Sequence, residues 1–495
     1  MPLRLVAILL FLANAATASD RVALVVGMSD YSSIITLKNA GNDAAGISET
    51  LADIGFGVTT LLDVSGDDLR REIDAFTIEA ETADLALVYF AGHGVEVEGK
   101  NFLIPVDADI MSNQDIERQA VSLDDFLAAV DRARKMRIVI LDSCRDDPFG
   151  DRLADVTSDT VGAGTDQTRS AGRAGLAKPS PDRGTLVAFA ARDGEKAFDG
   201  NGKHSPFAMA LMENLSRPGL EISLMFRQVR DQVLAETSNL QEPHTYGSLP
   251  GVPFYLAGAS DDESRVSAAD PRIAWADIRP EQEEKLARLA EQGDTRSMVG
   301  MAYMRLNSAD NRYDPIEAAA FLTRAADAGS PEAQFELAQL YEIGLGVEQD
   351  VPKALELYRT AAAAGFADAI NDLGFLYFQG GLGIIPNRKI GLEHFKRAAD
   401  LRHPQAMYNY AALIDDGLIE GQGPEDAAHY LYQSLRAGST DVYELLRDQP
   451  TMFKLDTRKA LQRRLAEFGF YSGGIDGDFG SGTQRGLKAA YGLEE

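Results

Sequence analysis

His93 and Cys144 are the two residues of this chain whose types and positions could support nucleophilic catalysis. Each follows an apolar run that predicts a buried parallel strand, residues 85–90 before His93 and residues 138–141 before Cys144. In an open parallel sheet, ligands and reacting groups gather at the carboxyl ends of the strands. The sequence therefore predicts an imidazole and a thiol on one edge of one sheet, the pair of groups needed for attack on a carbonyl carbon.

Residues 1–18 have the features of a secretory signal peptide. Arg4 precedes an apolar stretch over residues 5–12, and the small residues 16–18 predict cleavage after Ala18. The apolar stretch is too short to span a bilayer, and no later stretch is long enough. We expect a mature protein without a membrane span, exported to the periplasm or cell envelope.

Charge and cysteine content narrow the classes of function. A formal net charge of −28 argues against nucleic acid or an anionic membrane as a partner. Cys144 is the only cysteine, so no intramolecular disulfide can form. A lone thiol in an exported protein is a reactivity hazard unless it is used, which favours catalysis over the alternative of a small buried side chain.

Residues 19–257 alternate apolar strand-like runs with amphipathic helical patterns. Strands are predicted at 22–26 and 186–190, and a helix capped by Asn42 or Asp43 is predicted before Gly55. Ser122 and Asp125 suggest a capping box, and Pro206 suits the first turn of another helix. This alternation predicts an α/β domain with a mainly parallel sheet and flanking helices.

Five segments of this domain resemble the caspase and metacaspase superfamily, in particular bacterial caspase-like proteins. They are LKNAGNDA at 37–44, YFAGHG at 89–94, GKNFLIPVD at 99–107, VILDSCRDDPF at 139–149 and GKHSPF at 202–207. The resemblance runs from about Arg21 to Leu256. Asp-Ser rather than Gln-Ala precedes the cysteine, which makes metacaspases the closer likeness.

The resemblance implies a cysteine endopeptidase with a caspase-like fold. Cys144 would be the nucleophile and His93 its acid–base partner, and the N–H groups of Gly94 and Cys144 would stabilise the oxyanion. No third member of a triad is evident in the sequence. A dyad would suffice because a thiol is already partly ionised near neutral pH.

By the same resemblance, Asp43 and Asp142 would line the primary specificity pocket. Paired carboxylates favour a cation, and arginine best of all, so we expect cleavage after Arg or Lys. The alternative for Asp43 is that it only caps a helix. Ala91 stands where metacaspases have a serine, which removes one polar contact from this pocket.

Residues 151–183 have no periodic apolar face, so they predict a long exposed loop. In the family resembled, this position separates the two catalytic subunits and is often a processing site; an ordinary flexible insertion is the alternative. Self-cleavage is expected near the basic residues Arg152, Arg169, Arg173, Lys178 and Arg183.

No cofactor is required for this chemistry, but calcium is a possibility. Asp107, Asp109, Asp124 and Asp125 supply the hard oxygen ligands that calcium prefers, and metacaspases often use an aspartate cluster in this region. The alternative for Asp124 and Asp125 is that they stabilise the amino terminus of a helix.

After a polar linker at 258–280, residues 281–447 repeat themselves. Short Ala-rich segments ending at Gly293, Gly329, Gly365, Arg402 and Gly438 recur at a nearly constant step, which predicts a solenoid of helix pairs. These segments resemble Sel-like repeats, which are relatives of the tetratricopeptide type. Such arrays imply a protein partner.

Residues 456–495 predict a small helical module. A helical face with Leu461 and Leu465 is followed by a glycine-rich loop around Asp476 and by Phe479 and Thr483. The pattern resembles the peptidoglycan-binding domain of cell-wall hydrolases and implies peptidoglycan as a partner. The alternative is a capping unit for the repeat array.

The resulting hypothesis is an exported multidomain cysteine endopeptidase that cleaves a polypeptide substrate, followed by an all-α repeat adaptor and a wall-binding module. Two alternatives remain open at this point. The α/β domain could be a catalytically idle scaffold, or the repeats could be the principal functional part, an adaptor for envelope proteins.

Overall fold

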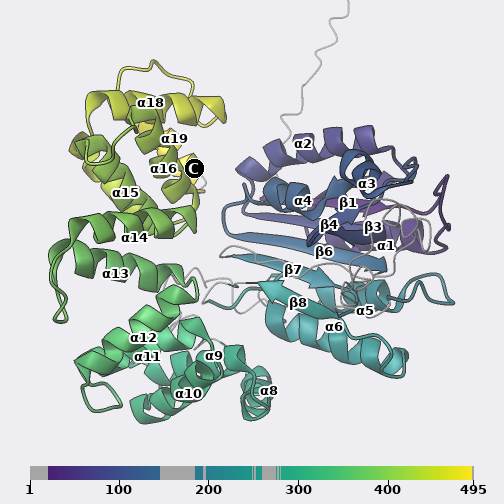
Figure 1. Ribbon diagram of the computed structural model, residues 1–495, viewed down its shortest axis with the longest axis horizontal. Helices are drawn as coiled ribbons and strands as arrows, with labels where there is room; N and C mark the ends of the chain where they lie inside the picture. Colours follow the sequence, from purple (N-terminus) through teal and green to yellow (C-terminus); the bar gives the residue numbers. More distant parts are fainter. Residues whose placement is uncertain are drawn as a thin grey trace, which may run out of the picture.

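The computed structural model describes residues 20–144, 184–192, 197–247, 249, 252–258, 275, 278 and 280–492. Figure 1 shows an α/β domain beside a helical array that ends in a small helical module. The predicted signal peptide and most of the predicted linker lie outside the described residues. Within the described part of the chain, no helix has both the length and the apolar character needed to cross a membrane.

The α/β domain is built on one eight-stranded sheet whose main path has the order β2-β1-β3-β6-β7-β8. The first five strands of this path are parallel, and β8 is antiparallel to β7. Two short strands, β4 and β5, extend the end of β3 in antiparallel fashion. The strands are β1 Arg21–Gly27, β2 Gly57–Leu62, β3 Leu85–Val97, β4 Lys100–Leu103, β5 Val121–Ser122, β6 Met136–Cys144, β7 Thr185–Phe189 and β8 His244–Gly247.

Helices cover both faces of the sheet because successive strand side chains point to opposite faces. In β1, Val22 and Leu24 pack with one helical layer and Ala23 and Val25 with the other. The first layer holds α2 Gly66–Thr82, α3 Asn113–Gln119 and α4 Leu123–Val130; the second holds α1 Ala40–Asp53, α5 Pro206–Leu215 and α6 Ile222–Glu236. The predicted α/β class is confirmed.

The helix starts show two correct local predictions and one error. Ser122 and Asp125 form the predicted capping box of α4, and Pro206 lies in the first turn of α5. The predicted cap at Asn42 or Asp43 is wrong, because α1 begins three residues earlier, at Ala40, after Asn39. Asp43 therefore lies inside the first turn, and its carboxylate is available for contacts outside the helix.

The predicted solenoid is confirmed as a series of antiparallel helix pairs. Its helices are α8 Pro280–Glu291, α9 Thr295–Leu306, α10 Pro315–Asp327, α11 Pro331–Ile343, α12 Val351–Ala363, α13 Ala367–Gln379, α14 Arg388–Asp400, α15 Pro404–Asp416, α16 Pro424–Arg436 and α17 Thr440–Asp448. Small alanines such as Ala325, Ala361 and Ala398 are fully buried, which lets neighbouring helices approach closely.

Arg402 interrupts the column of glycines that ends the second helix of each pair. Gly329, Gly365 and Gly438 have positive φ angles of 90°, 89° and 77°, and Arg402 adopts the same region with φ 59°. A non-glycine residue is strained there. The Arg402 guanidinium donates to the carbonyl of Asp131 at 2.7 Å, so a contact with the α/β domain accompanies the strain.

The carboxyl-terminal module consists of α18 Leu455–Glu467, α19 Ser481–Tyr491 and the loop between them. The fully buried Gln462 amide ties this loop together: it donates to Asp476 and Thr483 at 3.0 Å each and accepts from the Gly477 N–H at 2.7 Å. Leu461 shares one core with Tyr432 of the last repeat. The module therefore packs on the end of the array as a cap would.

The array contacts the α/β domain at both of its ends. At the first end, Leu224 packs with Trp275 and with α8 and α9. At the other end, Arg436 is 3% exposed and donates to the carbonyl of Ala490 at 2.8 Å and to those of Glu81 and Ala83. Glu81 lies at the end of α2 and Ala83 lies between α2 and β3, whereas Ala490 belongs to α19.

We expect Arg436→Met to lower the free energy of unfolding by about 3 kcal/mol, because the change leaves several buried carbonyls without a donor. Arg447→Met is the matched control, since Arg447 is 40% exposed and pairs with the exposed Asp448; its effect should stay below about 0.5 kcal/mol. The measurement is chemical denaturation followed by circular dichroism. Equal effects of the two substitutions would show that the buried contact does not stabilise the fold.

Candidate active site

The parallel pairing of β3 and β6 places His93 opposite Cys144. Their register begins at Leu85 opposite Met136 and ends at His93 opposite Cys144. Residues 85–90 of β3 and 138–141 of β6 are apolar and buried, which fixes the register. The structure thus brings the backbones of the two predicted catalytic residues side by side at the carboxyl edge of the sheet.

His93 is held by two hydrogen bonds from the loop after β1, one to its ring and one to its backbone. Its Nε2 lies 2.7 Å from the carbonyl oxygen of Ile35, and its backbone N–H donates to the Tyr31 hydroxyl at 2.8 Å. A carbonyl oxygen can only accept, so Nε2 carries a proton and Nδ1 of the neutral ring is the basic nitrogen. His93 is 7% exposed, and this burial lowers the pKa of its imidazole.

Gly94 lies where strand geometry turns its N–H toward β6. The Ile104 N–H donates to the His93 carbonyl at 3.0 Å, which makes Gly94 and Leu103 a pair that is not directly hydrogen-bonded. The Gly94 N–H therefore faces away from β4, on the side of the strand where Cys144 lies. This direction suits the oxyanion donor expected from the sequence.

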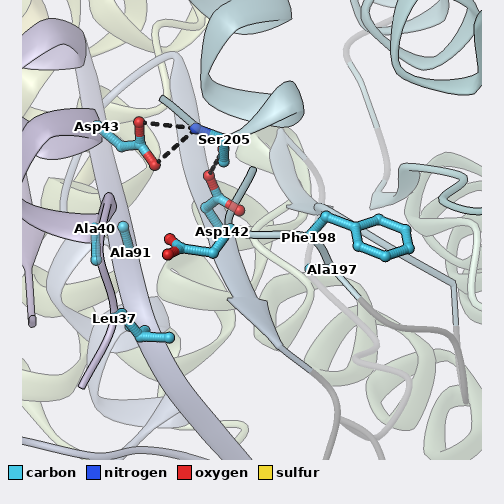
Figure 2. A pocket seen from close by; sticks show the side chains of 10 residues that line it. Leu37, Ala40, Asp43, Ala91, Asp142, Ala197, Phe198 and Ser205 are labelled. Carbon is cyan, nitrogen blue, oxygen red and sulfur yellow. Dashed lines mark hydrogen bonds between the residues drawn. The ribbon is translucent and has the colours of Figure 1, made fainter. Parts of the chain in front are cut away.

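A pocket opens beside the histidine at the same edge of the sheet. It is lined by Leu37, Ala40, Asp43, Ala91, Gly92, Asp142, Ala197, Phe198, Asp199 and Ser205. Figure 2 shows Asp43 and Asp142 on either side of Ser205. The two aspartates predicted for the specificity pocket therefore line one cavity, and Ala91 lies in its wall.

Ser205 links the two carboxylates. Its N–H donates to Asp43 at 3.1 and 3.2 Å, and its hydroxyl donates to Asp142 at 2.6 Å (Figure 2). The Tyr89 hydroxyl donates to the same oxygen of Asp142 at 3.1 Å, and His204 Nδ1 lies 2.9 Å from Asp43. The Ser205 oxygen also accepts from the Ala208 N–H and so caps α5.

Burial raises the pKa of both pocket aspartates. Asp43 is 2% exposed and Asp142 is 9% exposed, so desolvation is the largest cause for each. The Asp43 carboxylate raises the pKa of Asp142 further, and that of Asp199 raises the pKa of Asp43. A bound cation would relieve both effects.

Asp199 is a pocket carboxylate that the sequence did not reveal. Its side chain accepts the Lys38 N–H at 2.8 Å and the Asn39 N–H at 3.2 Å, which ties the segment before α1 to the wall of the pocket. The Ile35 carbonyl was missed as well. A main-chain acceptor leaves no signal in the sequence. Asp199 does have a signal, because it stands shortly before the GKHSPF motif and could have been considered as a pocket residue.

The four aspartates considered for calcium do not form a ligand set. Asp107 accepts the Gly66 N–H at 2.9 Å, and Asp125 completes the α4 capping box with Ser122. Asp109 and Asp124 are not gathered with them: among the described residues, no three His, Cys, Asp or Glu side chains are placed to hold a metal ion. The proposed processing residues Arg152, Arg169, Arg173, Lys178 and Arg183 lie outside the described residues.

Comparison with protein-family models identifies three kinds of unit. Residues 20–255 match the caspase domain, and residues 295–330, 331–366, 367–403 and 404–439 match the Sel1 repeat. Residues 454–490 match the putative peptidoglycan binding domain. These matches correspond to the α/β domain, the helical array and the carboxyl-terminal module of the structure.

Individual relatives share only parts of the chain. The human mucosa-associated lymphoid tissue lymphoma translocation protein 1 is 30% identical over 129 residues, which cover 26% of this chain and 15% of that protein. Caspase-1 of Felis catus is 26% identical over 161 residues, 31% of this chain and 36% of that protein. The crystal structure of caspase-1 from Spodoptera frugiperda is 17% identical, with a TM-score of 0.34, and covers 49% of this chain and 92% of that chain.

The raised pKa of Asp142 predicts how the stability of the folded protein depends on pH. A carboxyl whose pKa is raised on folding stabilises the folded state while it is protonated, and that contribution is lost as the pH rises through the folded pKa. An asparagine side chain has no carboxyl group to ionise, so the stability of the Asp142→Asn variant does not fall in this way as the pH rises. We expect the variant to be more stable than the parent protein by about 1 kcal/mol or more at about pH 8, with the difference shrinking toward about pH 5.

Denaturant titrations at several pH values measure this difference. Asp67→Asn is the control, because the Asp67 side chain is 99% exposed; its effect should not change with pH. A difference for Asp142→Asn that is also independent of pH would contradict the assignment of a buried, destabilising charge.

Proposed function

We propose that this chain, which carries a caspase domain, four Sel1 repeats and a peptidoglycan-binding domain, is an exported cysteine endopeptidase that cleaves polypeptides after Arg or Lys. The observation that carries the proposal is the end of the β3–β6 register, where His93 lies opposite Cys144 beside an acidic pocket. The presence of both His93 and Cys144 argues against the alternative of a catalytically idle scaffold.

In the proposed mechanism, Nδ1 of His93 takes the proton of the Cys144 thiol as the sulfur attacks the substrate carbonyl carbon. The Ile35 carbonyl keeps the other ring proton on Nε2 and orients the ring. The N–H groups of Gly94 and Cys144 stabilise the oxyanion, each by about 3 kcal/mol. His93 then protonates the leaving amine, and water hydrolyses the thioester, which returns the thiol.

The lowered pKa of His93 supports this role because it keeps the ring neutral, and therefore basic, at neutral pH. Every step uses groups of the protein, the substrate and water, so we propose that no cofactor is required. A chelator tests the calcium dependence expected from the sequence, for which the described residues offer no ligand set.

The preference for Arg or Lys rests on the pocket carboxylates. Asp43, Asp142 and Asp199 line a cavity whose buried charges are costly without a cation. The planar guanidinium of arginine can donate to more than one carboxylate at once, which an ammonium does less well. The same preference would direct self-cleavage to the basic residues between 151 and 183.

The remaining parts suggest location and partners. The peptidoglycan-binding match and the signal-like residues 1–18 support a place in the cell envelope, with the carboxyl-terminal module retaining the enzyme on peptidoglycan. The Sel1 repeats support a protein partner. Weak binding to the wall would suffice, because a polymeric lattice offers many sites for rebinding.

We expect Cys144→Ala and His93→Ala each to reduce peptidase activity by about a thousandfold or more, since each removes a reacting group. The assay is hydrolysis of fluorogenic peptides by the purified protein. Ile78→Ala is the control, because Ile78 is 74% exposed on α2. Cleavage retained by Cys144→Ala would end the enzyme assignment.

The pocket predicts both specificity and pH dependence. Asp142→Asn should lower kcat/KM for a peptide with Arg before the scissile bond by about thirtyfold or more, and should change cleavage after an uncharged residue much less. In the parent protein, KM for the Arg peptide should rise as the pH falls below neutral, because protonation removes the charges that bind the guanidinium. Efficient cleavage after Asp and none after Arg would refute the proposal.

Retention on the wall can be tested without truncating the chain, because the module shares a core with the last repeat. Gln462→Leu removes the buried amide that ties the Asp476 loop, and we expect it to reduce co-sedimentation with purified peptidoglycan sacculi. The exposed Gln349→Leu is the control. Added salt should not weaken the parent protein's binding, since both partners are anionic.

If the parent protein and the Gln462→Leu variant both stay in the supernatant, or both pellet equally, the module is not a wall anchor. Its role would then be limited to capping the repeat array.

A further inference from the structure

His204 approaches the acidic pocket from the segment that leads into α5. Its Nδ1 lies 2.9 Å from Asp43 Oδ1, and the histidine side chain is 16% exposed. An ionised carboxylate only accepts hydrogen bonds, so Nδ1 carries the proton that lies between the two groups. His204 therefore donates to a carboxylate that lines the pocket.

Gly46 of α1 leaves the space in which the His204 ring lies. A Cβ atom added to Gly46 would stand 3.2 Å from His204 Cε1 and 2.6 Å from Met212 Sδ, which is closer than side chains pack. Gly46 follows Asp43 by three residues, so the two positions are neighbours on the surface of one helix. The helix that carries the carboxylate thus also makes room for its donor.

His204 differs from the donors to the other pocket carboxylates. Asp142 accepts from two hydroxyl groups, and Asp199 accepts from two main-chain N–H groups. In the part of the chain that the structure describes, His204 is the one side chain that donates to a pocket carboxylate and can itself take up a proton. The charge of Asp43 is therefore the one that depends on a titratable partner.

The ionisation of Asp43 depends on its donors. Burial raises the pKa of Asp43, and the Asp199 carboxylate raises it as well. A hydrogen bond donated to the charged form acts in the opposite direction, and the Ser205 N–H and the His204 Nδ1–H both donate in this way. The other charged or titratable groups around the pair are Asp142, Tyr89, Lys203 and Lys38, whose ammonium donates to the carbonyls of Asn201 and Gly202.

His204 itself is neutral near neutral pH. Burial and the neighbouring Lys203 ammonium lower the pKa of its imidazole. A neutral donor holds the Asp43 carboxylate without cancelling its charge, whereas a charged donor in the same place would form an ion pair with it. The negative charge of Asp43 stays available for a cation in the pocket.

We propose that His204 is a positioning residue for substrate recognition, which keeps the Asp43 carboxylate oriented and ionised so that the pocket binds the cation of Arg or Lys at neutral pH. The inference rests on the proposed specificity and names a residue that governs it. It gives a role to the histidine of the GKHSPF segment at 202–207. Because His204 acts through Asp43, its loss weakens the binding of a basic side chain and leaves the chemical step in place.

The experiment compares variants of the full chain in the hydrolysis of a fluorogenic Arg peptide. His204→Phe keeps an aromatic ring over Gly46 and removes the donor, and His204→Asn puts an amide donor near the place of Nδ1. The matched control is His394→Phe, which removes an imidazole from α14 of the repeat array. A second peptide carries citrulline in place of arginine, since citrulline has nearly the same shape without the charge.

We expect His204→Phe to raise KM for the Arg peptide by about tenfold near neutral pH, with kcat changed by less than about twofold. His204→Asn should recover most of this loss, and His394→Phe should match the parent protein. KM for the citrulline peptide should change much less, because that peptide offers no cation. Circular dichroism confirms that each variant is folded, and His204→Ala replaces His204→Phe if the larger ring prevents folding.

The pH dependence separates a change of charge from a general disturbance of the pocket. Without its donor the pKa of Asp43 rises further, so KM of His204→Phe should begin to rise at a higher pH than that of the parent as the pH falls. At about pH 9 Asp43 is ionised in both proteins, and most of the difference should vanish. A disturbed pocket would instead give a difference that does not depend on pH.

Two results would overturn the role of His204 and leave the specificity intact. One is an unchanged KM of His204→Phe in a protein that prefers the Arg peptide; the other is a loss that His204→Asn does not recover and that persists at about pH 9. A parent protein that cleaves the Arg and citrulline peptides equally, or cleaves neither, would instead overturn the proposed function, and the role of His204 with it.

Discussion

The pairing of β3 with β6 is the constraint on which the rest of the structure depends. It aligns nine residue pairs, from Leu85 opposite Met136 to His93 opposite Cys144. Because side chains alternate along a strand, a slip of one residue would turn every side chain of one strand to the other face. Tyr89 and Phe90 on β3 are fully buried on opposite faces, so such a slip would disrupt both helical layers. The stability of the sheet therefore fixes the geometry of the site.

The acidic pocket works against that stability. Asp43 and Asp142 are buried close together, and their charged forms are disfavoured until a cation arrives. Ser205 holds both in place and also caps α5, so one residue joins the start of a helix to the acidic pocket. The pocket is thus organised without a ligand, and the substrate cation that we propose for it would supply the positive charge that it lacks.

The sequence predicted much of the fold because apolar runs and helix caps are local signals. The strands before His93 and Cys144, the α4 capping box and the repeat period are all readable from short segments. The start of α1 was predicted too late because Asn39, the true cap, makes its side-chain contacts with Asp199 and Gly200 instead of with its own helix. A prediction from local pattern has no access to such contacts.

The contacts that complete the site could not be predicted for the same reason. The Ile35 carbonyl meets His93 only through the folded loop after β1, and a main-chain group leaves no trace in residue type. Arg402 does leave a trace, since it replaces glycine in the repeat column, but its partner Asp131 lies in another domain. The sequence shows that position 402 departs from the glycine of the other repeats, but it does not show that the contact with Asp131 accompanies this change.

The central claim is that His93 activates Cys144 beside a pocket that accepts arginine. The most direct measurement is covalent labelling by a peptide electrophile that carries either Arg or Asp next to the reactive group, followed by mass spectrometry of the intact chain and its fragments. The account predicts rapid modification of Cys144 by the Arg reagent, slow modification by the Asp reagent, and loss of the rapid reaction in His93→Ala. A folded protein whose thiol reacts with neither reagent, or equally with both, would contradict the account.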